Sequence, residues 1–143
     1  MFQSTRVRDH MLLKPVLVTP DTDLFEAIHL ILVNKISGVT VIDEHRRPVG
    51  VLSELDCLKA ILTGTYYQMV GGRVSEYMTR GPIDTISPDQ DILSVAQSML
   101  DHKRRRRPVV GENGTLVGQV TCRQLLKALK EMDMPADPTE RDI

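Results

Sequence analysis

Aromatic residues are nearly absent from this 143-residue chain: they make up 3% of it, and none is tryptophan. Hydrophobic residues nevertheless account for 41% of the sequence. A core built from them must therefore be aliphatic, made of Leu, Ile, Val, Met and Ala. The length allows one compact domain or two very small ones.

The chain also lacks an excess of charge of either sign. Its 18 Lys and Arg residues are balanced by 19 Asp and Glu residues, which leaves a formal net charge of −1. A general nucleic-acid-binding protein usually carries a basic excess. We therefore expect no nucleic-acid partner, and any site for an anion must be local.

Cysteine is scarce, with Cys57 and Cys122 as its two representatives. Two thiols cannot form a disulfide scaffold, and their spacing matches no zinc site. We expect both to be small buried hydrophobic residues in a reducing cytoplasm. The N-terminal stretch contains no apolar signal segment, and no apolar run is long enough to span a bilayer, so no membrane insertion is expected.

Catalytic and metal-binding patterns are missing as well. The four histidines (His10, His29, His45 and His102) show no paired spacing with Asp or Cys that would define a metal site. No nucleophile elbow, P-loop or Ser-His-Asp set is visible. The sequence therefore predicts a protein that is not an enzyme, without a metal site or a catalytic cofactor.

A sequence repeat organises most of the chain. Residues 20–60 align without a gap on residues 88–128, at an offset of 68, and identical pairs include Pro20/Pro88, Asp23/Asp91, Val41/Val109, Gly50/Gly118 and Ala60/Ala128. Upstream the offset becomes 67, which pairs Val7/Val74, Met11/Met78 and Pro15/Pro82. This pattern indicates duplication of a unit of roughly 60 residues.

Each copy predicts the same succession of elements. These are a helical turn (7–11; 74–78), an extended segment (16–18; 83–86), a helix (24–35; 92–103), two strands (38–42 and 49–53; 108–110 and 116–121) and a last helix (55–62; 123–132). One copy alone is too small to bury much surface. We therefore expect an α/β fold of two β-α-β-β-α units, packed with pseudo-two-fold symmetry. The expected boundaries are 5–62 for the first motif, 63–73 for a linker, 74–132 for the second motif and 133–143 for a flexible tail.

The repeat resembles the CBS motif, named for cystathionine beta-synthase, and the tandem arrangement resembles a CBS pair, or Bateman module. The resemblance covers about residues 5–132 and is carried by the duplicated units, a "PVV"-type strand and the pattern Gly-x-x-Ser/Thr-x-x-Asp, here "GVLSELD". It implies a stand-alone regulatory module that binds an adenine nucleotide (AMP, ADP, ATP or adenosylmethionine) in a cleft between the motifs. It also implies a homodimer that signals to an unidentified effector protein. Whether magnesium accompanies the nucleotide is left open.

Chemistry and resemblance together place the better site around Ser53 and Asp56. A carboxylate at a helix start suits a ribose diol, and a hydroxyl there suits a phosphate. In the same site, the region of Ile83 is expected to supply apolar walls for the adenine, and Thr79 is expected to be a further ligand-binding residue. The spacing Ser-x-x-Asp is also an ordinary helix cap, but the duplication and the resemblance favour a ligand site.

The second copy departs from this pattern. Its corresponding stretch is "GQVTCRQ", in which Thr121 keeps the hydroxyl and Gln124 replaces the aspartate. An amide cannot match the two charged acceptors of a carboxylate. We therefore expect a weaker second site, formed by Val16, Ile36, Ser37, Gly38, Thr121 and Gln124.

Four consecutive arginines, Arg104, Arg105, Arg106 and Arg107, align with residues 36–39 of the first copy. The resemblance places them in the cleft of Ser53 and Asp56. In an extended segment alternate side chains face opposite ways, so two of the four can reach a phosphate. Several arginines would favour a polyphosphate over AMP, or a dinucleotide second messenger. A solvated face, pairing across a dimer interface, and a basic docking surface of a ligand-independent scaffold protein are the alternatives.

Overall fold

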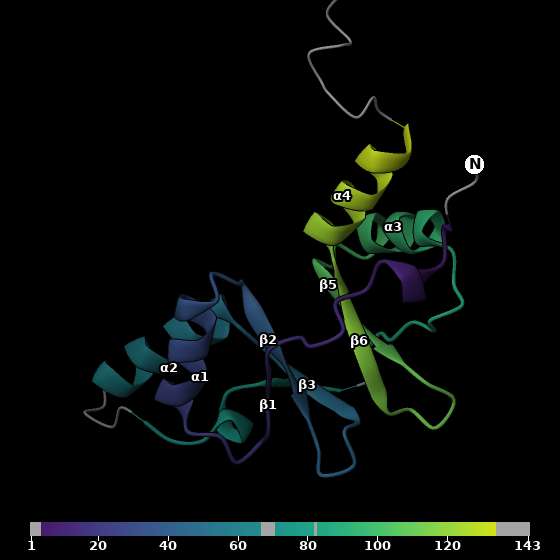
Figure 1. Cartoon of the computed structure of the whole chain (residues 1–143). Coiled ribbons are helices and arrows are strands. Elements are labelled where there is room, and N and C mark those ends of the chain that lie inside the picture. Colours follow the sequence, from purple (N-terminus) through teal and green to yellow (C-terminus); the bar gives the residue numbers. More distant parts are fainter. Residues whose placement is uncertain (1–3, 67–70, 82, 134–143) are drawn as a thin grey trace, which may run out of the picture. The chain divides into compact units, whose positions relative to one another are not determined.

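The computed structural model describes residues 4–66, 71–81 and 83–133, which form two compact units (Figure 1). The four-stranded unit comprises Pro15–Asp84 and Gly114–Leu116. The two-stranded unit comprises the described residues of Met1–Lys14, Thr85–Asn113 and Val117–Ile143. Neither unit consists of one copy of the repeat. The start of the first copy belongs to the two-stranded unit, with most of the second copy, and the start of the second copy belongs to the four-stranded unit, with most of the first.

The four-stranded unit is an α/β structure whose strands follow the order β1-β2-β3-β4. Strand β1 runs parallel to β2, and the other neighbours are antiparallel. Helices α1 and α2 pack against each other and bury an aliphatic core that includes Leu24, Val39, Val41 and Leu52. The elements in chain order are β1 (Leu17–Val18), α1 (Leu24–Val33), β2 (Gly38–Ile42), β3 (Pro48–Ser53), α2 (Glu54–Tyr66), the 3-10 turn η2 (Val74–Glu76) and β4 (Thr79–Arg80).

The two-stranded unit repeats this plan. Its elements are the 3-10 turn η1 (Val7–Asp9), α3 (Ile92–Asp101), β5 (Arg106–Val110), β6 (Leu116–Thr121) and α4 (Cys122–Asp133). Single bridges stand where the first unit has short strands: Ile86 pairs with Val109 in parallel, and Leu12 pairs with Gln119 in antiparallel. These pairs are the repeat equivalents of Val18–Val41 and Thr79–Val51. The duplication seen in the sequence is therefore a duplication of strand pairing.

The leader segment of each copy, residues 6–14 in the first and 73–81 in the second, completes the unit built around the other copy. Val7 is fully buried in the core of the two-stranded unit, and its N–H donates to the Gln90 carbonyl over 2.9 Å. Val74 is fully buried in the four-stranded unit, where its N–H donates to the Thr22 carbonyl, also over 2.9 Å. The repeat alone does not predict this exchange, because aligning two copies does not show which copy a segment folds onto.

The first helix of each copy ends two residues before the predicted end. Lys35 and Lys103 lie in the left-handed region, at φ 53° and 54°, and a residue in that conformation ends an α-helix. The next N–H groups donate back into the helix, from Ile36 to the Ile31 carbonyl and from Arg104 to the Met99 carbonyl. This is the usual Schellman geometry, with lysine in the place of glycine.

Other boundaries differ from the sequence prediction too. Strand β5 begins at Arg106 and not at residue 108, so two arginines lie within it. Helix α2 continues to Tyr66, into the expected linker. Strand β4 was not predicted, because two residues carry no periodic pattern. Residues 67–70 of the expected linker and 134–143 of the expected tail lie outside the described residues.

Candidate ligand site

Ser53 and Asp56 form a reciprocal cap at the start of α2. The Ser53 N–H donates to Asp56 Oδ2 over 2.9 Å, and the Asp56 N–H donates to Ser53 Oγ over 3.1 Å. Each side chain thus satisfies a backbone group at the start of the helix. Asp56 Oδ1 forms no hydrogen bond within the described part of the chain, so the capped carboxylate keeps one acceptor atom for another group.

Thr121 and Gln124 form the equivalent cap in the other unit. The Thr121 N–H donates to Gln124 Oε1 over 2.9 Å, and the Gln124 N–H donates to Thr121 Oγ1 over 3.3 Å. An amide oxygen therefore completes the cap as a carboxylate does. What the second copy lacks is a charged second acceptor, which bears on ligand binding and not on helix formation.

The glycine that opens each motif lies directly under a leader segment. A Cβ added to Gly50 would lie 2.8 Å from Met78 Sδ and 3.0 Å from the Thr79 carbonyl oxygen. At Gly118 the corresponding distances are 2.7 Å to Met11 Sδ and 2.9 Å to the Leu12 carbonyl oxygen. The "Gly" of the motif is thus explained by close packing of a methionine and a backbone strand, without reference to a ligand.

The four-stranded unit holds several of the predicted site residues, and two of them adjoin the cap of Ser53 and Asp56. Gly38 pairs with Ser53, and the Ser37 carbonyl accepts the Glu54 N–H over 2.9 Å. Thr79 is exposed on β4 beside β3. Ile36 and Val16 are half-buried against the core, and Ile83 is half-buried after β4. Residues assigned from the sequence to different sites, such as Ser37 and Ser53, are therefore neighbours in one unit.

The arginine run lies in the two-stranded unit and is divided by the strand. Arg104 and Arg105 are exposed between α3 and β5, and Arg106 is half-buried at the start of β5. The Arg105 carbonyl accepts the Cys122 N–H over 3.1 Å, so the run adjoins the start of α4. A site that unites these arginines with Ser53 and Asp56 draws on both units and stays a prediction.

Arg107 differs from the other three because it is buried, with 6% of its surface exposed. Its Nη2 donates to Ser98 Oγ on α3 over 3.0 Å, while its Nε has no hydrogen-bond partner among the described residues. The repeat equivalents of Arg107 and Ser98 are Val39 and Leu30, an apolar pair. Arg107 thus occupies a core position in its own unit.

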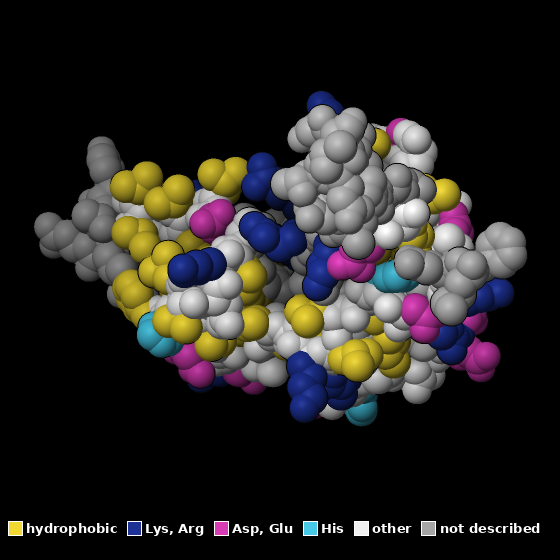
Figure 2. Space-filling view, turned by 45° about the horizontal axis from the view of Figure 1, so that its top comes forward, with side chains coloured by type: hydrophobic (Ala, Val, Ile, Leu, Met, Phe, Trp, Pro, Cys, Tyr) yellow, Lys and Arg dark blue, Asp and Glu magenta, His cyan; other side chains and the backbone are white. Residues whose placement is uncertain are grey.

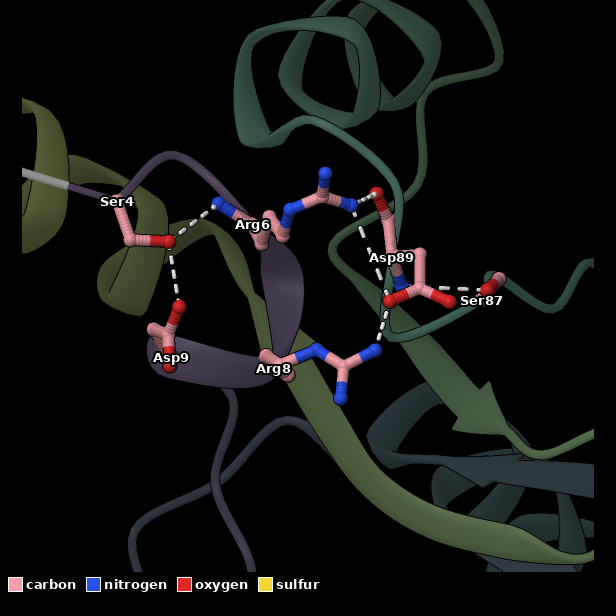
Figure 3. Close-up of polar contacts among 6 residues, drawn as sticks. All are labelled: Ser4, Arg6, Arg8, Asp9, Ser87 and Asp89. Carbon is pink, nitrogen blue, oxygen red and sulfur yellow. Dashed lines mark hydrogen bonds and ion pairs between the residues drawn. The ribbon is translucent and has the colours of Figure 1, made fainter.

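The leader segments are also held by arginine–aspartate contacts that were not predicted from the sequence. Arg6 donates to the Asp89 carbonyl over 3.1 Å, and Arg8 forms an ion pair with the Asp89 carboxylate (Figure 3). In the other unit Arg73 pairs with Asp21 over 3.0 Å. Arg6 and Arg73 are equivalent in the repeat, as are Asp89 and Asp21. An arginine and an aspartate that recur at equivalent positions of both copies were the sequence signal that could have predicted these contacts. Such exposed pairs contribute at most about 1 kcal/mol, and burial of the leader valines matters more.

The two cysteines differ in their exposure. Cys57 is buried as expected, but the prediction for Cys122 is wrong, because its thiol is exposed at the start of α4.

A pocket of about 340 Å³ lies at the far end of β5 from Arg106, between residues 85–89 and 110–112, and contains none of the predicted site residues. In the described part of the chain, no group of three or more His, Cys, Asp or Glu residues could hold a metal ion. There, too, no helix is long and apolar enough to cross a membrane.

The sequence model of the CBS domain matches residues 7–63 and 74–131. The chain belongs to the CBS domain family. The two matched stretches are the two copies of the repeat, so the protein is a tandem CBS pair. The cap at Ser53 and Asp56 is thus the one formed by the Gly-x-x-Ser-x-x-Asp segment of the first CBS motif.

Similar proteins include both enzymes and isolated CBS pairs. The chain is 34% identical to an inosine-5'-monophosphate dehydrogenase of Aquifex aeolicus, a match that covers 84% of this chain but 24% of the enzyme. It is 30% identical to an uncharacterized protein of Methanocaldococcus jannaschii, over 81% of this chain and 86% of the relative. The CBS pair thus spans about a quarter of the dehydrogenase and most of the uncharacterized protein.

Solved CBS pairs share the fold. CBSX2 in complex with AMP is 28% identical, with a TM-score of 0.77 over 90% of this chain and 98% of that chain. The CBS domain pair of protein MJ0100, in complex with 5'-methylthioadenosine and S-adenosyl-L-methionine, is 26% identical, with a TM-score of 0.73 over 87% and 99% of the two chains. Both of these neighbours hold ligands that contain adenosine.

Proposed function

We propose that this CBS pair is a cytoplasmic regulatory module without catalytic activity, which binds an adenine nucleotide such as AMP, ADP or ATP and signals to a partner protein. The adenosine-containing ligands of two CBS pairs with similar folds support the ligand class. The observation that carries the proposal is the cap at Ser53 and Asp56, which leaves one carboxylate oxygen of Asp56 available at a helix start. Such a charged acceptor suits the two hydroxyl groups of a ribose.

The remaining residues take complementary roles in this proposal. Thr79 and Ile83 line the adenine side, and the arginine run contributes cations for the phosphates, since a guanidinium donates to phosphate oxygens in pairs. Arg107 is the least suited of the four, because it is buried against Ser98. A magnesium ion would accompany the nucleotide only if the ligand is a polyphosphate.

A second, weaker site is proposed around Val16, Ile36, Ser37, Gly38, Thr121 and Gln124. The Thr121–Gln124 cap has the geometry of the first cap. Its amide oxygen is a neutral acceptor, and hydrogen bonds to charged groups are stronger than those to neutral groups. We therefore expect this site to bind the same ligand less tightly.

The test is calorimetric titration of AMP, ADP, ATP and S-adenosyl-L-methionine into the wild-type chain and the Asp56→Asn variant. Gln124 shows that an amide completes the cap, so Asp56→Asn should fold normally. Loss of the charged acceptor should weaken nucleotide binding about 10- to 100-fold. Gln124→Ala serves as the matched control and should leave the tighter site unchanged. If none of the four ligands binds, or if Asp56→Asn binds as tightly as wild type, the site assignment is wrong.

We also propose a homodimer, formed through exposed apolar residues on the helices of the four-stranded unit. Figure 2 shows hydrophobic side chains gathered at the left, over the part of the molecule that contains α1 and α2. The residues concerned are Phe25, Leu32, Val33, Leu55, Leu58 and Leu62, which are between 46% and 75% exposed. Apolar surface of this extent on a soluble domain is typical of a protein contact. Light scattering should give twice the monomer mass, and Leu58→Glu should reduce it.

Exposure of Arg104 and Arg105 also supports a second candidate function, a scaffold protein that uses the basic run without a nucleotide. In that case partner capture should be unaffected by nucleotides and lost in Arg105→Glu or Arg106→Glu. Capture that survives both substitutions would exclude this function.

A further inference from the structure

The exposed side of α4 carries a stripe of positive charge that its repeat equivalent lacks. Arg123, Lys127 and Lys130 are all exposed, and Leu126 lies among them with 70% of its surface exposed. Spacings of three, four and seven residues place these four side chains on one face of the helix. We call this set of four residues the basic stripe.

The same positions of α2 are occupied differently. Leu55, Lys59 and Leu62 stand where α4 has its three cations, and Leu58 stands in the place of Leu126. The first turn of α2 contains acidic residues, whereas that of α4 contains none. The basic stripe is therefore a property of the second copy and not of the repeated fold.

Most of the stripe works against the helix that carries it. Arg123, near the start of α4, opposes the helix dipole, whereas Lys130, in the last turn, is favourable to it. Like charges four residues apart (Arg123 and Lys127) and three apart (Lys127 and Lys130) repel each other. Among the residues that the structure describes, none of the three side chains forms an ion pair or a hydrogen bond, and Glu131, four residues after Lys127, does not pair with it. Acidic groups from outside the chain would offset these costs.

The positive surface does not end at the helix. The Cys122 N–H donates to the Arg105 carbonyl over 3.1 Å, and Cys122 Sγ lies 3.7 Å from the Arg104 carbonyl oxygen. The exposed beginning of the arginine run therefore lies beside the first turn of α4. Within a chain of net charge −1, this is a local concentration of cations.

We propose that the basic stripe is the docking surface for an acidic amphipathic segment of a partner protein. Carboxylates of that segment would pair with Arg123, Lys127 and Lys130, and an apolar side chain would cover Leu126. A nucleic acid would make no use of an exposed leucine, and the stripe offers no aromatic residue for base stacking. A membrane surface would need more apolar residues than one leucine among three cations. The charge pattern and the leucine together fit a protein segment.

The inference is independent of nucleotide binding, because the stripe contains no residue of the proposed nucleotide sites. Its test uses the full chain and a labelled synthetic helical peptide with glutamates spaced three and four residues apart beside a row of leucines. Fluorescence anisotropy at about 0.15 M salt measures binding where distant surface charges are screened. A second peptide has glutamine in place of every glutamate.

The acidic peptide should bind and the glutamine peptide should not. The double variant Lys127→Glu/Lys130→Glu should weaken binding about tenfold or more, since each change replaces an attraction by a repulsion. Lys59→Glu, at the equivalent of Lys127 on α2, is the matched control and should have no effect. Leu126→Ala should weaken binding several-fold while Leu58→Ala does not. Circular dichroism would confirm that each variant keeps its helices.

Three results would overturn the inference. One is no binding of the acidic peptide, and another is equal binding by the wild-type chain and the Lys127→Glu/Lys130→Glu variant. The third is that the chain binds duplex DNA or phosphatidylserine vesicles more tightly than the peptide, and that the Lys127→Glu/Lys130→Glu variant loses this binding. That last result would assign the stripe to a nucleic acid or a lipid surface.

Discussion

Replacing the buried Arg107 by the residue of the other copy should make the protein more stable. Arg107 is 6% exposed at a core position of β5, where Val39 of β2 is 1% exposed. Its partner Ser98 corresponds to Leu30, which packs partly buried against the core of its own unit. The double variant Ser98→Leu/Arg107→Val therefore transplants an apolar pair that the same fold already accommodates.

The magnitude follows from what Arg107 leaves unsatisfied. Its Nε has no partner in the described structure, and Nη2 makes a bond to a neutral hydroxyl. A buried donor without an acceptor costs about 1–3 kcal/mol. Exchanging buried ionic groups for packed hydrophobic residues is neutral or stabilises by about 1–4 kcal/mol. We expect the double variant to raise the free energy of unfolding by about 1–3 kcal/mol.

Urea denaturation followed by far-ultraviolet circular dichroism measures this change. The opposite transplant, Leu30→Ser/Val39→Arg in the four-stranded unit, is the matched control and should lower the free energy of unfolding by about 3 kcal/mol or more. A double variant Ser98→Leu/Arg107→Val that is clearly less stable than wild type would refute the reasoning. Arg107 would then contribute more through its contacts than its burial costs.

Three further predictions concern single residues. Asp23 accepts two N–H groups at the start of α1, at 3.0 and 3.2 Å, whereas Asp91 accepts one over 3.3 Å at the start of α3. Asp23→Ala should therefore lower the free energy of unfolding by about 1–2 kcal/mol, and Asp91→Ala should lower it less. Urea denaturation measures both changes. The backbone N–H of Arg47, and then that of His45, holds the pKa of Asp43 below its ordinary value. Its contribution is present above the unfolded pKa and is lost as pH falls through the folded pKa, so acid titration of Asp43→Asn should show a smaller loss of stability. Burial raises the pKa of the Cys57 thiol, and Asp56 and Glu54 add to the effect. Iodoacetamide at about pH 8 should therefore label Cys122 before Cys57, which mass spectrometry can follow. Equal labelling rates of the two thiols in the folded protein would contradict this.

The repeat predicted most of the fold because its signals are local. Helical spacing of apolar residues predicted α1 and α3, and the start of each at Leu24 and Ile92 is confirmed. The ends were placed two residues too far because lysine is not the residue expected at a left-handed helix terminus. Strand β4 escaped prediction because it exists through its pairing with β3 and has no pattern of its own.

The sequence predicted the helix-start group of the candidate site but not what surrounds it, and its role in ligand binding stays a prediction. The spacing of Ser53 and Asp56 correctly indicated a group at a helix start, and the structure shows a reciprocal cap there. The amide of Gln124 was expected to bind a nucleotide more weakly than the carboxylate of Asp56 does, and that remains a prediction. The four arginines look alike in the sequence, yet one is buried under α3 and two are exposed, because strand and loop geometry orient their side chains differently.

The sequence by itself determined the duplication, the order of elements in each copy and the family. These depend on local periodicity and on two sets of similar residues in register. The tertiary structure decided which copy each leader completes, which face Arg107 occupies and which thiol is exposed. Val7 and Val74 are interchangeable in the alignment, and each is fully buried among elements of the other copy. Burial of an apolar side chain depends on what surrounds it in space, and no pattern along the chain specifies that.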